Sequence, residues 1–192
     1  MFATTVQLAL PEWAHGIVDP ARTVPGDEAK VALAVELARL NIEAQSGGPF
    51  GAAVFDADTD RIVAIGVNRV LPQQCSVAHA ETMALMLAQQ QLGRARLNRD
   101  LDGRPVGRYV LATSAQPCCQ CYGACVWAGI DRLLIGARSE DVEALTVFDE
   151  GPLPADWPGE LERRGIEVVR DLARDAAREV LRTYGTSGAR HY

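Results

Sequence analysis

Two short motifs contain the residue types that bind zinc and transfer protons. His79 is one of three histidines in the chain, and Glu81 follows it by two positions. Cys118 and Cys121 form a C-x-x-C motif directly after Pro117. One histidine and two cysteines would give zinc three protein ligands and leave a fourth position for water, which is the arrangement of catalytic rather than structural zinc sites. The two motifs therefore predict a catalytic zinc centre.

The spacing of the cysteines suits metal binding at the start of a helix. The proline before the motif is favoured in the first turn of a helix, so we expect a helix to open there. A spacing of three places Cys118 and Cys121 on one helix face, and the helix dipole lowers the pKa of thiols near the N-terminus. Cys119 points about 100° away from Cys118. We expect Cys119, Cys125 and Cys75 to pack or to line a pocket, with Cys75 as an alternative ligand.

Glu81 suits the role of a proton carrier beside such a zinc ion. A carboxylate two positions after a ligand can face the metal without binding it, take a proton from water and pass it to a leaving group. H-x-E followed by P-C-x-x-C is the pattern of zinc-dependent base deaminases. A single H-x-E is more often a solvated or capping pair, and a single C-x-x-C can be a redox pair. Their occurrence together favours a catalytic site.

Composition limits the classes of function. The chain has 192 residues, of which 48% are hydrophobic, and this suits one globular domain. Its net charge of -6 disfavours a nucleic-acid partner, because such binding depends on neutralising phosphates. No apolar run approaches the roughly 20 residues that span a bilayer, and no positive region opens the chain as in a signal peptide. We expect a cytoplasmic protein without a membrane partner, and four cysteines within eight positions also suit a reducing compartment.

Alternating helical and strand patterns predict the elements that carry these motifs. Residues 1–26 are read as an irregular arm packed on the domain, 27–184 as the zinc-dependent domain, and 185–192 as a tail. The alternation predicts an α/β layered sandwich whose later half is mostly parallel. Helices are expected over 27–45, 76–93, from 117 onward, 139–145 and 171–184, and strands over 50–70 as a hairpin, 108–114, 132–137 and 166–170.

A family resemblance is carried by five segments, which are GGPFGAAVFD (47–56), GVNRV (66–70), HAE (79–81), PCCQCYGACVWAGI (117–130) and TVFDEG (146–151). In these segments the chain resembles the cytidine deaminase-like superfamily, and within it the purine branch with bacterial guanine deaminases and tRNA adenosine deaminases. The resemblance implies a three-layer αβα sandwich around a five-stranded mixed sheet, and a homodimer. It also implies zinc (Zn2+) held by His79, Cys118 and Cys121, with Glu81 moving protons.

The resemblance also implies contacts to a small-molecule purine. Asn68 would hydrogen-bond the base, although it could instead stabilise a turn, and the backbone N–H of Ala80 would lie near the ring edge. Glu150, in the FDEG run, could accept hydrogen bonds from N1–H and the 2-amino group of guanine, unless this run is only a solvated acidic loop. We therefore expect hydrolytic deamination of a free purine-type base, with guanine giving xanthine and ammonia.

Departures from the family pattern keep other substrates open. Gln116 stands where the family commonly has glutamate before Pro-Cys, and CSVA (75–78) replaces the usual Asp-Pro-Thr. A related heterocycle, a nucleoside or a tRNA adenosine could therefore be the substrate. A terminal aromatic residue, Tyr184 or Tyr192, could help to close the site. A third possibility is a non-catalytic module, in which four protein ligands would enclose a structural zinc ion.

Overall fold

Five strands form one mixed sheet in the computed structural model, which describes residues 2–17, 19 and 21–189. Their order across the sheet is β2-β1-β3-β4-β5. β1 runs antiparallel to β2 and β3, whereas β3, β4 and β5 are parallel, so the predicted parallel later half is confirmed. The strands are β1 (Gly51–Asp56), β2 (Ile62–Val67), β3 (Tyr109–Ala115), β4 (Arg132–Ala137) and β5 (Glu167–Val169).

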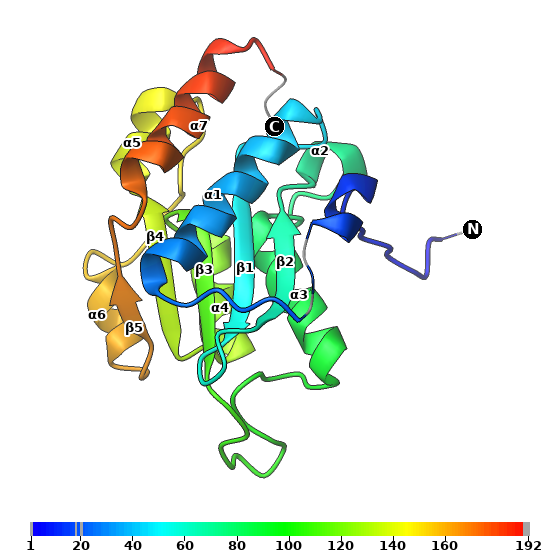
Figure 1. Ribbon diagram of the computed structural model, residues 1–192, viewed down its shortest axis with the longest axis vertical. Helices are drawn as coiled ribbons and strands as arrows, with labels where there is room; N and C mark the ends of the chain where they lie inside the picture. The colour runs from blue at the N-terminus through cyan, green and yellow to red at the C-terminus, as the bar shows by residue number, and fades with distance from the viewer. Residues whose placement is uncertain (1, 18, 20, 190–192) are drawn as a thin grey trace.

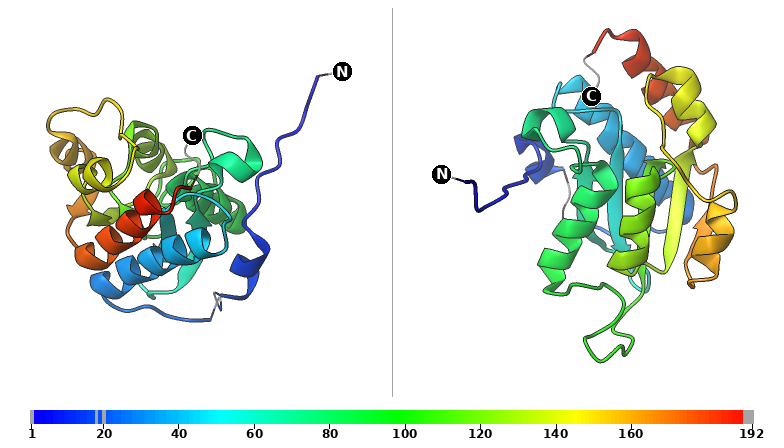
Figure 2. Two further views of the ribbon diagram at one scale, coloured as in Figure 1. Left: turned by 90° about the horizontal axis from the view of Figure 1, so that it is seen from above. Right: turned by 180° about the vertical axis from the view of Figure 1, so that it is seen from behind.

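Helices cover both faces of this sheet (Figure 1; Figure 2). The predicted three-layer αβα sandwich is therefore confirmed. One face packs against α1 (Asp27–Glu43), α5 (Ser139–Leu145) and α7 (Arg174–Thr186). The other packs against α3 (Ala80–Leu92), α4 (Cys119–Ala128) and α6 (Trp157–Glu162). In the part of the chain that the structure describes, no helix is both long and apolar enough to cross a bilayer.

The inner strand β1, which lies between β2 and β3, is buried on both sides, and this explains its continuous apolar sequence. Ala53 and Phe55 belong to the core on the α1 side, and Ala52 and Val54 belong to the core on the α3 side. All four are fully buried. Successive side chains of a strand point to opposite faces, so helices on both faces require apolar residues at every position.

Several element boundaries differ from the predictions. α4 begins at Cys119 with Cys118 as its N-cap, so the helix opens two residues after Pro117. Two short helices, α2 (Val70–Gln73) and α6, lie where no helix was expected. The carboxylate of Asp156 accepts a hydrogen bond from the Gly159 N–H and caps α6. Helices of four and six residues are too short to show a clear hydrophobic period.

The N-terminal arm packs on the domain and contains a short 3-10 helix, η1 (Glu12–Gly16). Ala14 is buried in the core on the α1 side, and Thr23 forms an isolated bridge with Arg61. The first residues of the arm extend away from the body of the molecule (Figure 1). At the other end, α7 continues to Thr186, two residues into the expected tail.

Candidate metal centre

The two predicted ligand motifs lie at the N-termini of α3 and α4. His79 is the N-cap residue of α3, and Cys118 is the N-cap residue of α4. Gly66 allows α3 to pack closely on β2, because a Cβ atom there would lie 2.1 Å from the carbonyl oxygen of Ala80. The start of α3 is thereby fixed against the sheet.

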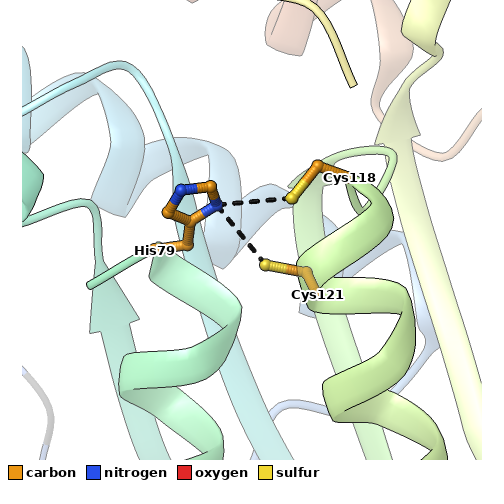
Figure 3. Close-up of side chains that lie close together, drawn as sticks. All are labelled: His79, Cys118 and Cys121. Carbon is orange, nitrogen blue, oxygen red and sulfur yellow. Dashed lines mark hydrogen bonds between the residues drawn. The ribbon is translucent and has the colours of Figure 1, made fainter. Parts of the chain in front are cut away.

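His79, Cys118 and Cys121 converge on one point (Figure 3). Nδ1 of His79 lies 3.4 Å from Sγ of Cys118 and 3.6 Å from Sγ of Cys121. Zn–N and Zn–S bonds of about 2.05 and 2.3 Å at a tetrahedral angle place the nitrogen and sulfur about 3.6 Å apart. The three side chains therefore fit a zinc ion, and they are the only such group of three among the described residues.

The cluster favours the anionic form of a cysteine that zinc requires. A hydrogen bond from the Cys121 thiol lowers the pKa of Cys118 to about 4; burial opposes this effect, and the hydrogen bond with His79 adds to it. The pKa of Cys121 is raised, because Cys121 shares this hydrogen bond and is buried. Burial disfavours the charged form of His79, but its hydrogen bond with Cys118 and the nearby negative charges raise its pKa.

Glu81 lies in the first turn of α3 with its side chain in the same pocket as the ligand cluster. It is 6% exposed. Burial raises the pKa of Glu81 to about 7, the negative charge of Cys118 adds to the effect, and His79 opposes it. A carboxyl group that titrates near neutral pH can both accept and return a proton.

The pocket beside the cluster contains two of the three predicted substrate contacts. Asn68 and Glu150 line it, whereas Ala80 is the fully buried first residue of α3 and is not among the lining residues. Burial raises the pKa of Glu150 to about 9, and the charges of Glu81 and Cys118 act in the same direction. The pocket has an empty volume of about 420 Å³, including its open mouth, and is lined by Phe50, Asn68, His79, Glu81, Gln116, Cys118, Phe148, Asp149 and Glu150.

The sequence reasoning missed Asp149 and the two aromatic pocket residues, Phe50 and Phe148. Their ring centroids lie 5.5 Å apart, and both rings line the pocket. The ring of Tyr184 stacks on that of Phe148 with centroids 5.8 Å apart, and Tyr184 is not among the residues that line the pocket. Tyr192 lies outside the described residues. The sequence did contain a signal for Phe50 and Phe148, because the segments GGPF and TVFDEG each contain an aromatic residue.

The remaining cysteines are separate from the ligand cluster. Cys125 is fully buried one turn beyond Cys121, as expected for a packing residue. Cys119 is exposed, so the expectation that it packs or lines the pocket is wrong. It follows the N-cap directly, and its side chain points away from the face that carries the two ligand sulfurs. Cys75 is partly exposed and lies outside the group of three.

The fold and the ligand cluster together define a zinc-binding deaminase domain. A family model described as the cytidine and deoxycytidylate deaminase zinc-binding region matches residues 25–137, which is more than half of the chain. The chain belongs to this family. The predicted class, a zinc-dependent hydrolytic deaminase with a cytidine deaminase-like fold, is thereby confirmed.

Three proteins are similar to this chain in sequence or structure. A structure of guanine deaminase from Nitrosomonas europaea shares 45% identity, covers 96% of this chain and 98% of that chain, and has a TM-score of 0.87. A probable cytosine deaminase of Schizosaccharomyces pombe is 34% identical over 58% of this chain and 62% of its own length. Guanine deaminase of Bacillus subtilis is 34% identical over 61% of this chain and 67% of its own length.

Proposed function

We propose that this chain deaminates guanine hydrolytically, giving xanthine and ammonia. The observation that carries the proposal is the buried carboxyl group of Glu150 in the same pocket as Glu81 and the ligand cluster. In its ionised form this carboxyl group can accept hydrogen bonds from N1–H and the 2-amino group of guanine, and these two donors would lower the raised pKa of Glu150 when the base binds. Similarity to two guanine deaminases, one over 96% of this chain, supports the same substrate.

In this proposal the ligand cluster, Glu81, and the pair Glu150 and Asn68 have separate chemical tasks. His79, Cys118 and Cys121 would hold zinc, which supplies a Lewis acid that lowers the pKa of a water molecule. Glu81 accepts the proton of the attacking water at its carboxylate and returns protons to the ring nitrogen and the departing amine. Glu150 and Asn68 hydrogen-bond the base and fix its orientation in the pocket. Water and guanine then account for all atoms of xanthine and ammonia.

The aromatic residues in the pocket wall suit a flat heterocyclic substrate. Phe50 and Phe148 place aromatic rings at the pocket, where they can contact the face of a base. A purely structural zinc ion would need a fourth protein ligand, and the described residues offer a group of three. The net charge of -6 disfavours a tRNA substrate.

The experiment that tests this proposal measures ammonia release by zinc-loaded protein from guanine, guanosine, adenine, cytosine, cytidine and pterins. Glu81→Gln serves as the blank. Release from guanine that is absent in the blank is expected. Release from another ring would keep the role of Glu81 and contradict that of Glu150, and no release from any compound would contradict the proposal as a whole.

We also propose a homodimer that forms through the exposed faces of α3 and α4. An apolar groove lies between these helices, and Trp127 at its edge is 77% exposed. Met86 lines this groove and also a second one, formed with residues 6–9 of the arm, so the apolar surface continues onto the arm. Such a surface is typical of association sites, and a second copy offers the same surface in return.

A cytoplasmic location is the last part of this proposal. The thiols of Cys118 and Cys121 must stay reduced to bind metal, because oxidation would convert them into groups that no longer bind it as thiolates. Cell fractionation combined with thiol alkylation after metal removal would test this. Both thiols are expected to react in the cytoplasmic fraction, and a disulfide between them would contradict the proposal.

A further inference from the structure

We propose that a hydrogen-bonded brace from the N-terminal arm through Ser46 and Asn41 positions Asn68 in the pocket. The inference rests on the proposed function, in which Asn68 contacts the base. It assigns a purpose to the arm, which the deaminase chemistry described above does not use.

Asn41, near the end of α1, is the centre of this brace. It is fully buried. Its Nδ2 donates hydrogen bonds to the carbonyl oxygens of Gly48 at 2.8 Å and Asn68 at 2.9 Å. Its Oδ1 accepts a hydrogen bond of 2.7 Å from the Ser46 hydroxyl. Both ends of the amide are therefore used, which fixes its orientation and joins two segments of the pocket.

The arm holds the brace from its other side. The indole Nε1 of Trp13 donates a hydrogen bond of 2.9 Å to the Ser46 hydroxyl. Arg69 donates to the carbonyl oxygen of Ser46 and, at 3.2 Å, to that of Ala9. The arm is thus bonded to the loop before β1 and to the residue that follows Asn68.

On the pocket side, Asn68 is held against the loop before β1. Its Oδ1 accepts hydrogen bonds of 3.3 Å from the backbone N–H groups of Gly48 and Val70, and its own N–H donates to the Phe50 carbonyl oxygen at 3.1 Å. The side-chain oxygen of Asn68 is therefore held by backbone groups of two segments, while the residue lines the pocket. A Cβ atom on Gly47 would lie 1.8 Å from the Asn68 carbonyl oxygen, so the contact requires glycine.

These contacts make Trp13, Ser46 and Asn41 positioning residues. None of the three lines the pocket, whereas Asn68 and Phe50 do. Loss of a brace hydrogen bond would loosen the segment that carries both pocket residues. The geometry of a bound base is sensitive to displacements of this kind, since small misplacements reduce the rate strongly.

The test uses the two outer residues, because replacing the fully buried Asn41 risks unfolding the chain. Trp13→Phe removes the indole donor, and Ser46→Ala removes the bridging hydroxyl. Each variant is expected to lower kcat/KM by about tenfold, on the base that the panel identifies as the best substrate. Trp157→Phe and Ser139→Ala are the matched controls, which make the same chemical changes at half-buried positions, and they should stay within about twofold of wild type because neither residue belongs to the brace or lines the pocket.

A double-mutant cycle with Asn68→Ala separates positioning from a general structural role. If the brace acts through Asn68, Ser46→Ala should lower kcat/KM by less than about twofold once Asn68 is alanine. An unchanged tenfold loss in that background would overturn the proposal.

Hydrogen exchange gives a second measurement that does not depend on activity. Ser46→Ala should accelerate exchange of the Gly48, Asn68 and Val70 amides, whereas Ser139→Ala should not. If none of the tested bases is deaminated, the proposed function is contradicted. The hydrogen-exchange rates would still show whether the brace holds the segment that carries Asn68. Unchanged exchange at all three amides would overturn it.

Discussion

The backbone N–H of Cys119 donates a hydrogen bond of 2.8 Å to the carbonyl oxygen of Glu150. This bond connects the loop after α5 to the first residue of α4, whose N-cap is Cys118. The same helix start therefore holds a ligand thiol and fixes the segment that carries Glu150. An acidic side chain on an otherwise irregular loop is thereby placed beside the proposed proton carrier, Glu81.

Replacing Glu150 by glutamine should remove recognition of guanine. The glutamine amide has only one acceptor oxygen, so when it accepts from one donor of the base its N–H2 group faces the other donor. Sites that hydrogen-bond a substrate discriminate strongly when a partner is lost, so kcat/KM for guanine should fall by about 100-fold or more. The zinc content should not change, which metal analysis would check.

The control for the Glu150→Gln substitution is Glu143→Gln on the exposed surface of α5. It makes the same chemical change and should leave guanine turnover close to that of wild type. Guanine turnover by Glu150→Gln at the level of this control would show that Glu150 makes no contact with the substrate.

Replacing Glu81 by glutamine should separate metal binding from turnover. Glutamine keeps the size of the side chain but cannot accept a proton, so the deamination rate should fall by about 1000-fold or more. The variant should still bind about one zinc ion per chain, because the three ligands are untouched. Ammonia release measured together with zinc content checks both points, and near-normal turnover would remove Glu81 from the mechanism.

The ligand cluster could be predicted from the sequence because zinc accepts few residue types at fixed spacing. His79 and Cys118 occupy helix starts, and helix starts can be read from local sequence. The pocket wall could not be read in this way. Phe50 and Phe148 come from loops that are far apart in the chain, and only the packing of the sheet brings them together. The brace through Asn41 was missed for the same reason.

Trp127 offers a test of the proposed dimer. A charged residue within the apolar contact would have to be buried without a partner, so Trp127→Lys should give a monomer. Leu101→Lys is the matched control, because Leu101 is fully exposed in the loop before β3. Sedimentation of wild type and both variants measures the mass. A wild-type monomer, or a Trp127→Lys dimer as stable as the control, would contradict the α3–α4 interface.

The stability of the fold at low pH should depend on Asp141, which is 5% exposed. Its carboxylate accepts hydrogen bonds from Arg174 at 2.7 and 3.0 Å and from the N–H of Arg138 at 2.9 Å. The hydrogen bond with Arg174 lowers the pKa of Asp141 below its ordinary 3.8, although burial opposes this effect. A group with a lowered folded-state pKa stabilises the protein above its ordinary pKa, and the stabilisation is lost as the pH falls through the folded-state value.

Asp141→Asn should therefore lower the free energy of unfolding by about 1–2 kcal/mol at pH 7, a range that allows for the solvent exposure of the arginines. As the pH falls below 3.8 the difference from wild type should shrink, because the unfolded wild-type chain then binds a proton at Asp141 more readily than the folded protein does. Urea unfolding of zinc-loaded protein at pH 7, 5 and 3.5 would measure this, with Asp175→Asn on the exposed start of α7 as the control. A difference that stays constant down to pH 3.5 would show that Asp141 acts through packing rather than through its charge.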